Sequence, residues 1–192
     1  WDDELVETGS YITAKRAEIV QSLSDAAQPI HRELTNQGEV LRLTYRPNVD
    51  MNTAASQEEL EQSLRQLLET QRTREVAQGF TVCGPHRDDL RMMLDEADAG
   101  LYASRGQCRT MILAVRLAEA SFLRNQRRQE PILLLDDVLS ELDTVRRSAV
   151  LSMAAQYEQC FITTTDVEPI DRKYLPQMTR FIVRQGHVEP AR

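Results

Sequence analysis

The stretch that most constrains the fold of this chain is PILLLDDVLSELD, which runs from Pro131 to Asp143. Residues 132–135 are consecutive branched aliphatic residues, and Asp136 and Asp137 follow them directly. A run that is apolar at every position predicts a strand covered on both faces, as in a parallel sheet flanked by helices. Ligands of such sheets bind at the carboxyl ends of the strands, which is where these two aspartates would lie.

Two adjacent carboxylates at a strand end repel each other unless a cation or a shared proton relieves the repulsion. Mg²⁺ that carries a nucleotide phosphate is the natural cation, because P-loop NTPases place an acidic strand end at that point. The alternative is an ordinary buried strand that ends in an Asx turn. From these residues alone, the two interpretations are equally open.

The composition restricts the classes of protein to consider. With 192 residues, 41% of them hydrophobic, the chain has enough material for one sizeable domain or two small ones. A net charge of −7 gives no general attraction to nucleic acid, so any DNA contact requires a local basic patch. No apolar run is long enough to span a membrane, and we expect no leader peptide.

Two further features concern the cellular setting and the extent of the chain. Its three cysteines are widely spaced and odd in number, which predicts reduced thiols in a cytoplasmic protein rather than a disulfide framework or a zinc site. The chain opens with Trp1 inside a charged, helix-like phrase, so we expect it to be a piece of a longer protein.

Residues 1–79 are predicted to form a mainly helical subdomain. Apolar residues repeat with helical spacing along residues 2–36, and a second helix ends near Gly79. A short half-buried strand is expected between them, over residues 41–45. Strands and helices alternate afterwards, which predicts an α/β lobe over residues 80–192 and a domain boundary near Gly79.

The α/β lobe is expected to be a partial sheet flanked by helices. Its strands are predicted over residues 81–83, 90–94, 132–135, 160–164 and 181–183. Helices are predicted over residues 107–124 and 144–156, and the first should turn Ile112 and Ala118 towards the core.

A second motif, SRGQ at residues 104–107, precedes the helix predicted over 107–124. Ser104 can cap that helix, and Gln107 stands three positions later, which satisfies the capping-box rule without any ligand. The same geometry suits anion binding, because a helix start with a free hydroxyl and a glycine lets a phosphate approach the backbone. Taken alone, the stretch favours the capping interpretation.

The order of the motifs changes that balance. The helix start, an amphipathic helix, the apolar strand that ends in two acids and the phrase SELD at 140–143 follow one another. This order resembles the second half of an ABC-type ATPase head, with its signature motif, Walker B strand and D-loop. Four phrases narrow the resemblance to the RecF family of bacterial recombinational-repair proteins: GPHRDDL at 84–90, SRGQCRT at 104–110, LLLDDVLSELD at 133–143 and FITTTD at 161–166.

The resemblance implies an α/β fold, the head lobe of an ABC/SMC-type P-loop ATPase, joined to a mainly helical subdomain. It implies an ATP-dependent DNA-binding protein that dimerises with ATP and Mg²⁺ and hydrolyses ATP slowly. RecF proteins act on single-stranded and gapped duplex DNA with RecR, and indirectly with RecO, in gap repair, replication restart and SOS induction. We therefore expect DNA, RecR and a second copy of the chain as partners, and no membrane.

The resemblance also assigns roles to the acidic strand end. Asp136 would hold Mg²⁺ through water, and Asp137 would stand where related ATPases carry the glutamate that polarises the attacking water. Ser140 and Asp143 would form the D-loop at the dimer seam. Residues 163–165 are threonines where transport ATPases carry a switch histidine. Either a hydroxyl or backbone contact replaces it, or its function is missing.

At the signature motif, Ser104, Gly106 and Gln107 would close over the γ-phosphate of ATP held by a partner protomer. Arg105 replaces a glycine of the commoner signature, and it either adds positive charge over the phosphates or is solvated. The phosphate-binding loop GxxxxGK[ST] is absent from these residues. We therefore expect this chain by itself to bind ATP weakly and to be inactive.

Several features are ambiguous from the sequence. His86, with Asp88 and Asp89, suggests either a metal site or a loop that packs against the nucleotide side or the joint between lobes. Arginines within 124–128 and 146–147 either contact DNA phosphates or are solvated, and no residue is assigned to DNA. The alternative functions are another ABC-type head, such as a transporter subunit, and a structural module that binds no nucleotide.

Overall fold

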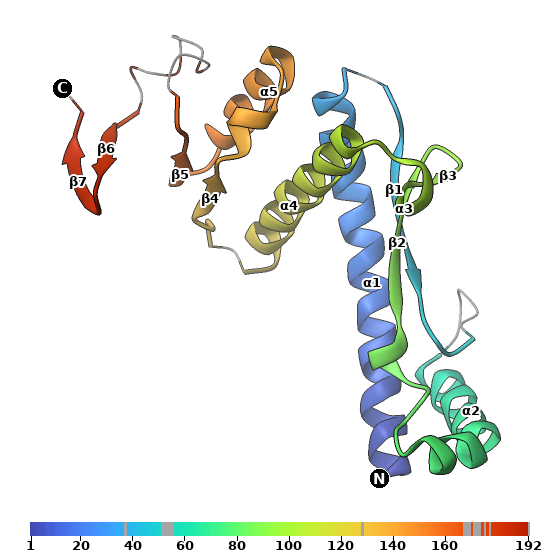
Figure 1. The fold of residues 1–192 in the computed structure, drawn as a ribbon. Helices are drawn as coiled ribbons and strands as arrows, with labels where there is room; N and C mark the ends of the chain where they lie inside the picture. Colours follow the sequence, from blue (N-terminus) through green and yellow to red (C-terminus); the bar gives the residue numbers. More distant parts are fainter. Residues whose placement is uncertain are drawn as a thin grey trace. The chain divides into compact units, whose positions relative to one another are not determined.

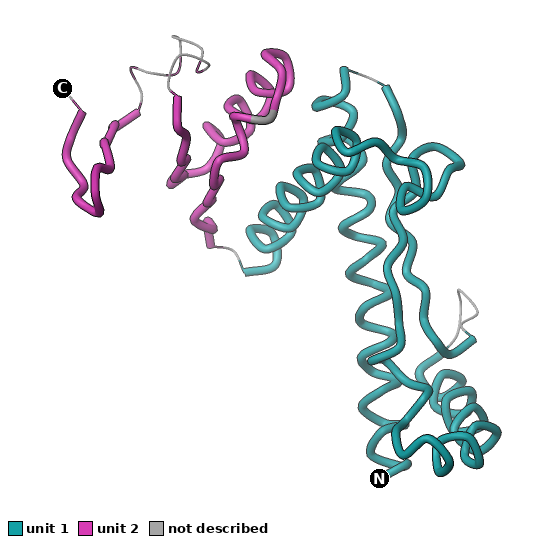
Figure 2. The backbone as a smooth tube through the Cα atoms, in the orientation of Figure 1, with its two compact units in different colours: residues 1–127 teal, residues 128–192 magenta. Residues whose placement is uncertain are grey.

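The computed structural model describes residues 1–36, 38–50, 56–127, 129–166, 170, 174, 176 and 178–191, without the side chain of Glu141. The chain forms two compact units, residues 1–127 and 128–192, which Figure 2 shows in different colours. The sequence predicted a domain boundary near Gly79. The compact units divide the chain later because a strand before Gly79 pairs with a strand after it.

The first unit is built on one long helix and a small antiparallel sheet (Figure 1). Helix α1 covers Asp2–Leu34, which confirms the long helix that the periodicity predicted. Strand β1 (Leu41–Arg46) pairs with β2 (Asp89–Leu94), and β2 pairs with the short β3 (Ala97–Asp98). Because β1 belongs to the predicted helical part and β2 to the predicted α/β part, the sheet joins the two segments.

Three further helices complete the first unit. They are α2 (Gln57–Gln78), α3 (Ala99–Tyr102) and α4 (Arg105–Arg127). Helix α2 begins at a capping box between Ser56 and Glu59 and ends at Gly79, whose φ of 74° is the left-handed conformation that stops a helix. Figure 1 shows α2 beside the N-terminal half of α1 and α4 across its C-terminal half.

The core between α1 and α2 requires a very close approach of the two helices. Val6 of α1 is buried there with Leu60, Leu64 and Leu68 of α2. At Gly9 of α1, an added Cβ would lie only 2.9 Å from Cδ2 of Leu64. Because a real Cβ does not tolerate that distance, packing alone accounts for a glycine at this position.

A buried aspartate ties the GPHRDDL phrase to the first unit. The side chain of Asp88 is 3% exposed, and it accepts hydrogen bonds from Arg16 Nη1 at 3.1 Å, Asn48 N at 2.9 Å and the Tyr45 hydroxyl. Arg16 Nη1 also donates to the carbonyl of Pro85. These bonds join α1, β1 and the loop after β1, so the phrase contributes to the packing of this unit.

Replacement of Asp88 by alanine is expected to lower the free energy of unfolding by about 2–4 kcal/mol, because three donors lose their acceptor. Asp89→Ala, at the exposed neighbour, removes the same charge and should cost about 0.5 kcal/mol or less. Urea unfolding of both variants measures the difference, and equal losses would refute the role of Asp88.

Spectroscopic titration of Tyr45 gives a second readout of the same substitution. Desolvation, together with the bond to Asp88, raises the pKa of Tyr45 to about 12. The stability that the protonated hydroxyl contributes is present below the ordinary tyrosine pKa of 10.0 and is lost as the pH rises through about 12. In Asp88→Ala the pKa of Tyr45 should fall back towards its ordinary value.

The prediction of a strand over residues 81–83 is wrong. Val82 N donates to the Glu75 carboxylate at 2.7 Å, and Gly84 N donates to Asn48 Oδ1 at 3.2 Å. These backbone groups bond to side chains instead of a neighbouring strand, and the chain then forms the 3₁₀ helix Pro85–Arg87.

The prediction for the core face of α4 is partly wrong. Ala118 is buried as expected, but the Ile112 side chain is 52% exposed. The buried residues of α4 lie to either side of Ile112, and they are Thr110, Met111, Leu113, Ala114, Leu117, Ala118 and Ala120. A helix turns 100° per residue, so this small error in phase exposes a residue that was expected inside.

The second unit contains the predicted parallel strand pair. Strand β4 (Leu133–Asp136) pairs in parallel with β5 (Cys160–Thr163), and the 3₁₀ helix Val138–Glu141 and α5 (Thr144–Ala154) lie between them in sequence. Further along the chain, β6 (Phe181–Arg184) and β7 (His187–Pro190) form an antiparallel hairpin. Its turn, Gln185 and Gly186, has φ values of 49° and 81°, as a tight two-residue turn requires.

The expectation that β4 is covered on both faces is contradicted. Leu133 and Leu135 are buried, whereas Leu134, between them, is 70% exposed. Its partner in the parallel register, Phe161, is 52% exposed. In the described part of this unit, the sheet therefore has one covered face and one open apolar face.

The three cysteines are unpaired, as the sequence predicted. Cys83 is buried, and burial together with its contact to the Glu75 carboxylate raises the pKa of its thiol to about 12. Such a thiol is inert at neutral pH. No helix in the part of the chain that the structure describes is long and apolar enough to cross a membrane.

Candidate nucleotide site

The SRGQ motif, residues 104–107, forms the start of α4. Ser104 Oγ accepts a hydrogen bond from Gln107 N at 3.2 Å, and Ser104 N donates to Gln107 Oε1 at 2.8 Å. These bonds form the capping box that the spacing predicted. Ser104, Arg105 and Gly106 are all exposed, and Gln107 is half-buried. The cap uses the Ser104 oxygen as an acceptor, and the hydroxyl proton can still be donated to an anion.

Gly106 differs from Gly9 in that no contact among the described residues explains it. A Cβ added at Gly106 would meet no heavy atom of those residues within 4 Å, and its φ is not in the left-handed region. Glycine inside a helix costs about 0.5–1 kcal/mol relative to alanine. The space above Gly106 is therefore open to a ligand or a partner that approaches the backbone.

Gln107 is held by a residue that the sequence analysis did not single out. Its Nε2 donates to the carboxylate of Glu39, in the connection between α1 and β1. With its Oε1 bonded to Ser104 N, both ends of the Gln107 amide have partners. No local pattern identifies Glu39, because the contact joins residues that are far apart in sequence.

The motif with the two adjacent aspartates lies at the carboxyl end of β4. Asp136 is the last residue of the strand, and both it and Asp137 are exposed. Asp137 has φ 50° and ψ 23°, a left-handed conformation that few residues other than glycine adopt, although aspartate is among those that do. The carboxylates are therefore presented to solvent at the edge where parallel sheets bind ligands.

Thr163 ends β5 directly opposite Asp136. Its hydroxyl donates to Asp136 Oδ1 and accepts from Asp137 N at 3.0 Å. Thr163 therefore bonds to both residues of the acidic strand end. That one of residues 163–165 replaces the switch histidine stays a prediction.

Side chains of the second unit stabilise the turn that follows Asp137 by hydrogen bonds. Ser140 Oγ donates to the Asp137 carbonyl at 2.9 Å. Arg147 of α5 donates from Nε to Leu139 O at 3.0 Å and from Nη2 to Leu142 O at 2.6 Å. The guanidinium of Arg147 therefore stabilises the turn, and a contact between Arg147 and DNA stays a prediction.

Asp143 is the N-cap of α5. Its Oδ1 accepts from Arg146 N at 2.9 Å, and its side chain remains mostly exposed. Arg146 is also a weak ion-pair partner of Asp143, at 3.7 Å. Arg128, one of the basic residues considered for DNA, lies outside the described residues.

The acids suit a particular kind of metal site. Within the described ranges, no three or more His, Cys, Asp or Glu side chains are grouped so that they could hold a metal ion. The ring nitrogen Nε2 of His86 lies 3.1 Å from the carbonyl of Thr81, which fits the packing interpretation of that loop. A pair of carboxylates without further ligands fits Mg²⁺, which keeps several waters and takes its remaining ligands from substrate phosphates.

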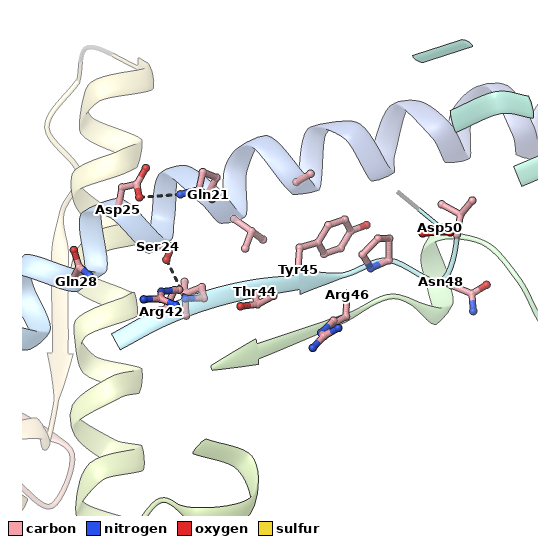
Figure 3. A pocket seen from close by; sticks show the side chains of 15 residues that line it. Gln21, Ser24, Asp25, Gln28, Arg42, Thr44, Tyr45, Arg46, Asn48 and Asp50 are labelled. Atoms are coloured by element: carbon pink, nitrogen blue, oxygen red, sulfur yellow. Dashed lines mark hydrogen bonds between the residues drawn. The ribbon is translucent and has the colours of Figure 1, made fainter. Parts of the chain in front are cut away.

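A groove of about 690 Å³ between α1 and β1 is separate from these motifs (Figure 3). Its lining includes Gln21, Ser24 and Asp25 of α1 and Arg42 and Thr44 of β1. Ser24 Oγ accepts from Leu43 N at 3.0 Å, so the side chain of the helix satisfies one edge amide of the strand. The predicted nucleotide residues are not part of its described lining.

The predicted site residues thus form two local sets. Residues 104–107 belong to the first compact unit, and residues 136–143 with Thr163 belong to the second. The first set offers an uncovered helix start that favours an anion. The second offers two carboxylates that favour a hydrated cation. Each set, within its own unit, has one part of the chemistry that a nucleotide–Mg²⁺ site requires.

Comparison with known proteins gives one consistent result, although no protein-family model matches the chain. It is 37% identical over 187 residues to the DNA replication and repair protein RecF of Staphylococcus carnosus, covering 97% of this chain and 50% of that protein. RecF of Chloroflexus aurantiacus is 37% identical over 189 residues, covering 98% and 48%. RecF of Staphylococcus epidermidis is 39% identical over 188 residues, covering 97% and 51%.

Solved structures agree with the sequence relatives. The recombination mediator protein RecF of the RecFOR pathway, in its ATP form, superposes with a TM-score of 0.83 at 26% identity, covering 100% of this chain and 49% of that one. A second RecF structure from the same pathway, described as RecF-ATPrS, gives 0.83 at 28% identity, covering 98% and 49%. These matches confirm the predicted α/β class. The chain spans about half the length of the relatives that it matches.

Proposed function

Because the chain belongs to the RecF family, we propose that it is the C-terminal part of an ATP-dependent DNA-binding repair protein. In this proposal a preceding half carries the phosphate-binding loop, and the two halves form the complete protein. The complete protein would act in the cytoplasm, in recombinational repair of single-strand gaps, in replication restart and in SOS induction. Its partners would be single-stranded and gapped DNA, RecR and, indirectly, RecO, in line with the RecFOR pathway of its solved relatives.

One observation carries the proposal: the chain has a helix start with an exposed glycine and, separately, an acidic strand end. Among the described residues, neither packing nor backbone conformation requires a glycine at position 106. Asp136 and Asp137 are consecutive and exposed, so both carboxylates are open to a hydrated cation. A nucleotide with Mg²⁺ would account for both features.

In the complete protein, the acids would act on the Mg²⁺ side of bound ATP. Asp136 would hold Mg²⁺ through its water shell, and the ion would supply charge neutralisation at the phosphates. Asp137 would orient and polarise the attacking water. Its side chain is one methylene shorter than glutamate, so slow hydrolysis is expected, with the ATP-bound dimer persisting between turnovers.

The helix start would act on ATP held by a second copy. Ser104, Gly106 and Gln107 would contact the γ-phosphate, to which the exposed Arg105 would add positive charge. Ser140 and Asp143, on the turn after the acids, would lie at the dimer seam. ATP would therefore join two protomers, and the dimer would be the state that binds DNA.

The preceding half would also cover the open face of the β4–β5 sheet. Leu134 and Phe161 are neighbours on that face, and both are more than half exposed. Burial of such residues contributes about 25 cal/mol per Å² of apolar surface. The proposal therefore gives these side chains an intramolecular partner.

The function is tested by the assembly of the complete protein. Without nucleotide it should sediment as a monomer, and with ATP and Mg²⁺ as a dimer. Fluorescence anisotropy should show that gapped duplex DNA binds at least ~10-fold more tightly to the ATP state, a coupling of about 1.4 kcal/mol. A protein that stays monomeric with ATP and Mg²⁺ would contradict the proposal.

The variant Gly106→Ala distinguishes an effect on ATP-driven dimerisation from an effect on stability. Within α4 the substitution should leave stability unchanged or raise it by about 0.5–1 kcal/mol, because alanine favours a helix and meets no neighbour. In the dimer the added methyl group would stand between the backbone and the phosphate. Dimerisation should therefore weaken at least ~10-fold while the urea midpoint does not fall, and unchanged dimerisation would count against contact at this position.

A further inference from the structure

Thr163 links the two acids through a single hydroxyl group. The oxygen accepts from Asp137 N at 3.0 Å, and its proton is donated to Asp136 Oδ1. The parallel ladder between β4 and β5 ends at the pair of Asp136 and Thr163, so the first bond extends the pairing of the strands by one peptide group. Because the hydroxyl both donates and accepts, each bond polarises the other and strengthens it.

The bond to Asp137 restrains a backbone that is unfavourable by itself. A left-handed conformation costs a residue with a Cβ about 1–2 kcal/mol, so surrounding contacts must hold it. Asp137 is held on both sides, since its N–H bonds to Thr163 and its carbonyl accepts from Ser140 Oγ at 2.9 Å. The direction of the Asp137 carboxylate therefore depends on Thr163.

The bond to Asp136 has a different effect. It occupies Oδ1 of the carboxylate with a donor from the neighbouring strand, which restricts rotation of the side chain. The second carboxylate oxygen can still accept water. The same hydroxyl group thus orients Asp136, which is proposed to hold Mg²⁺, directly. Through the backbone it also orients Asp137, which is proposed to polarise water.

The two neighbouring threonines do not share this position. Thr164 Oγ1 donates to the carbonyl of Asp166 at 2.8 Å and belongs to a local turn. Thr165 is exposed, and among the described residues its hydroxyl has no hydrogen-bond partner. Thr163 is exposed as well, so the core does not require a threonine there.

We propose that Thr163 is the positioning residue of the acidic strand end, and that its hydroxyl sets Asp136 and Asp137 together for Mg²⁺ and water. We call the two hydrogen bonds of the Thr163 hydroxyl the clamp. The consequence of the clamp for Mg²⁺ and water rests on the proposed function, whereas the two bonds themselves do not. Loss of the hydroxyl would release both acids at once, which no other single side chain among the described residues would do.

The test compares three variants of the complete protein. Thr163→Val keeps the branched shape and the strand preference but removes both bonds, and Thr163→Ser keeps the hydroxyl. Thr179→Val is the control, because it removes an exposed hydroxyl of the same unit that lies outside both motifs. Amide hydrogen exchange at Asp137 is measured without nucleotide. The Mg²⁺ concentration for half-maximal ATP-driven dimerisation is measured by sedimentation, and kcat and KM for ATP are measured separately.

In Thr163→Val, exchange at Asp137 should accelerate at least ~10-fold, and the Mg²⁺ requirement should rise at least ~5-fold. The value of kcat should fall ~10- to 100-fold, with KM for ATP within ~2-fold, because the nucleotide itself is bound elsewhere. Thr163→Ser should restore all of these quantities, and Thr179→Val should match the wild type.

Two results would overturn the inference, and they differ from failure of the proposed function. If exchange at Asp137 is the same in Thr163→Val and Thr179→Val, the clamp does not exist in solution. If exchange accelerates but the Mg²⁺ requirement and kcat match those of Thr179→Val, the clamp does not position the acids. A wild-type protein that neither dimerises with ATP nor hydrolyses it would refute the proposed function instead.

Discussion

The Ser104→Arg variant of the complete protein is expected to bind ATP as tightly as the wild type and to form no ATP-driven dimer. Ser104 is exposed at the start of α4, where its hydroxyl would meet the phosphate of ATP on a second copy. A long guanidinium side chain would occupy that space and remove the hydroxyl. The dissociation constant of the dimer should rise at least ~100-fold, which corresponds to about 2.7 kcal/mol.

The measurement needs two assays, because ATP binding and assembly must be separated. Titration with a fluorescent ATP analogue at low protein concentration reports binding to the monomer. Sedimentation velocity at high concentration with ATP and Mg²⁺ reports the dimer. Dimers of Ser104→Arg under these conditions would show that the start of α4 does not meet the nucleotide.

Ser56→Arg is the matched control for this variant. Ser56 is also exposed, and it also caps a helix of the first unit through a capping box, with Glu59 in the role of Gln107. Loss of either cap costs about 1 kcal/mol of stability. Because only position 104 is proposed to meet ATP, Ser56→Arg should lose similar stability and still dimerise.

The second large effect is expected at Asp137. An asparagine at this position would keep the backbone bonds to Thr163 and Ser140, since asparagine tolerates the left-handed conformation, and would lose only the charge of the carboxylate. In the variant Asp137→Asn, ATP hydrolysis should therefore fall at least ~100-fold, or about 2.7 kcal/mol in the barrier. ATP-driven dimerisation should persist, and the dimer should live longer because hydrolysis no longer ends it.

Single-turnover phosphate release measures hydrolysis, and dilution of preformed dimers measures their lifetime. Asp95→Asn is the control, because Asp95 is also an exposed aspartate with a positive φ, 52°, at a turn of the first unit. Its Oδ1 accepts from Val40 N, and an asparagine oxygen can do the same. If hydrolysis in both variants is alike, Asp137 is not the residue that activates water.

Much of the local structure was predictable because its causes are local. The heptad spacing along α1, the apolar run of β4 and the turn residues of the final hairpin each depend on neighbours in the sequence. The failures concern long-range bonding. Residues 81–83 look like a strand, but the amide of Val82 bonds to Glu75, and that of the following Gly84 bonds to Asn48. No local pattern states where a backbone donor will find its acceptor.

The features of the candidate site also separate into those with local causes and those that depend on long-range contacts. The capping box at Ser104 and Gln107 follows from a spacing of three residues, and the position of Asp136 and Asp137 follows from where an apolar strand stops. The roles of Glu39 and Thr163 could not be predicted in this detail. Each bonds to a site residue that is distant in sequence, and only the packing of the chain brings them within hydrogen-bond distance.

For this protein, the sequence by itself determined the helices, the parallel strand pair and the two motifs, since periodicity and capping act over a few residues. Only the tertiary structure decided which threonine holds the acids, that Asp88 is a buried acceptor, and that Gly106 faces open space whereas Gly9 does not. Those facts depend on distances between segments that are far apart in sequence. The packing of the whole unit sets these distances, so no short stretch of residues predicts them.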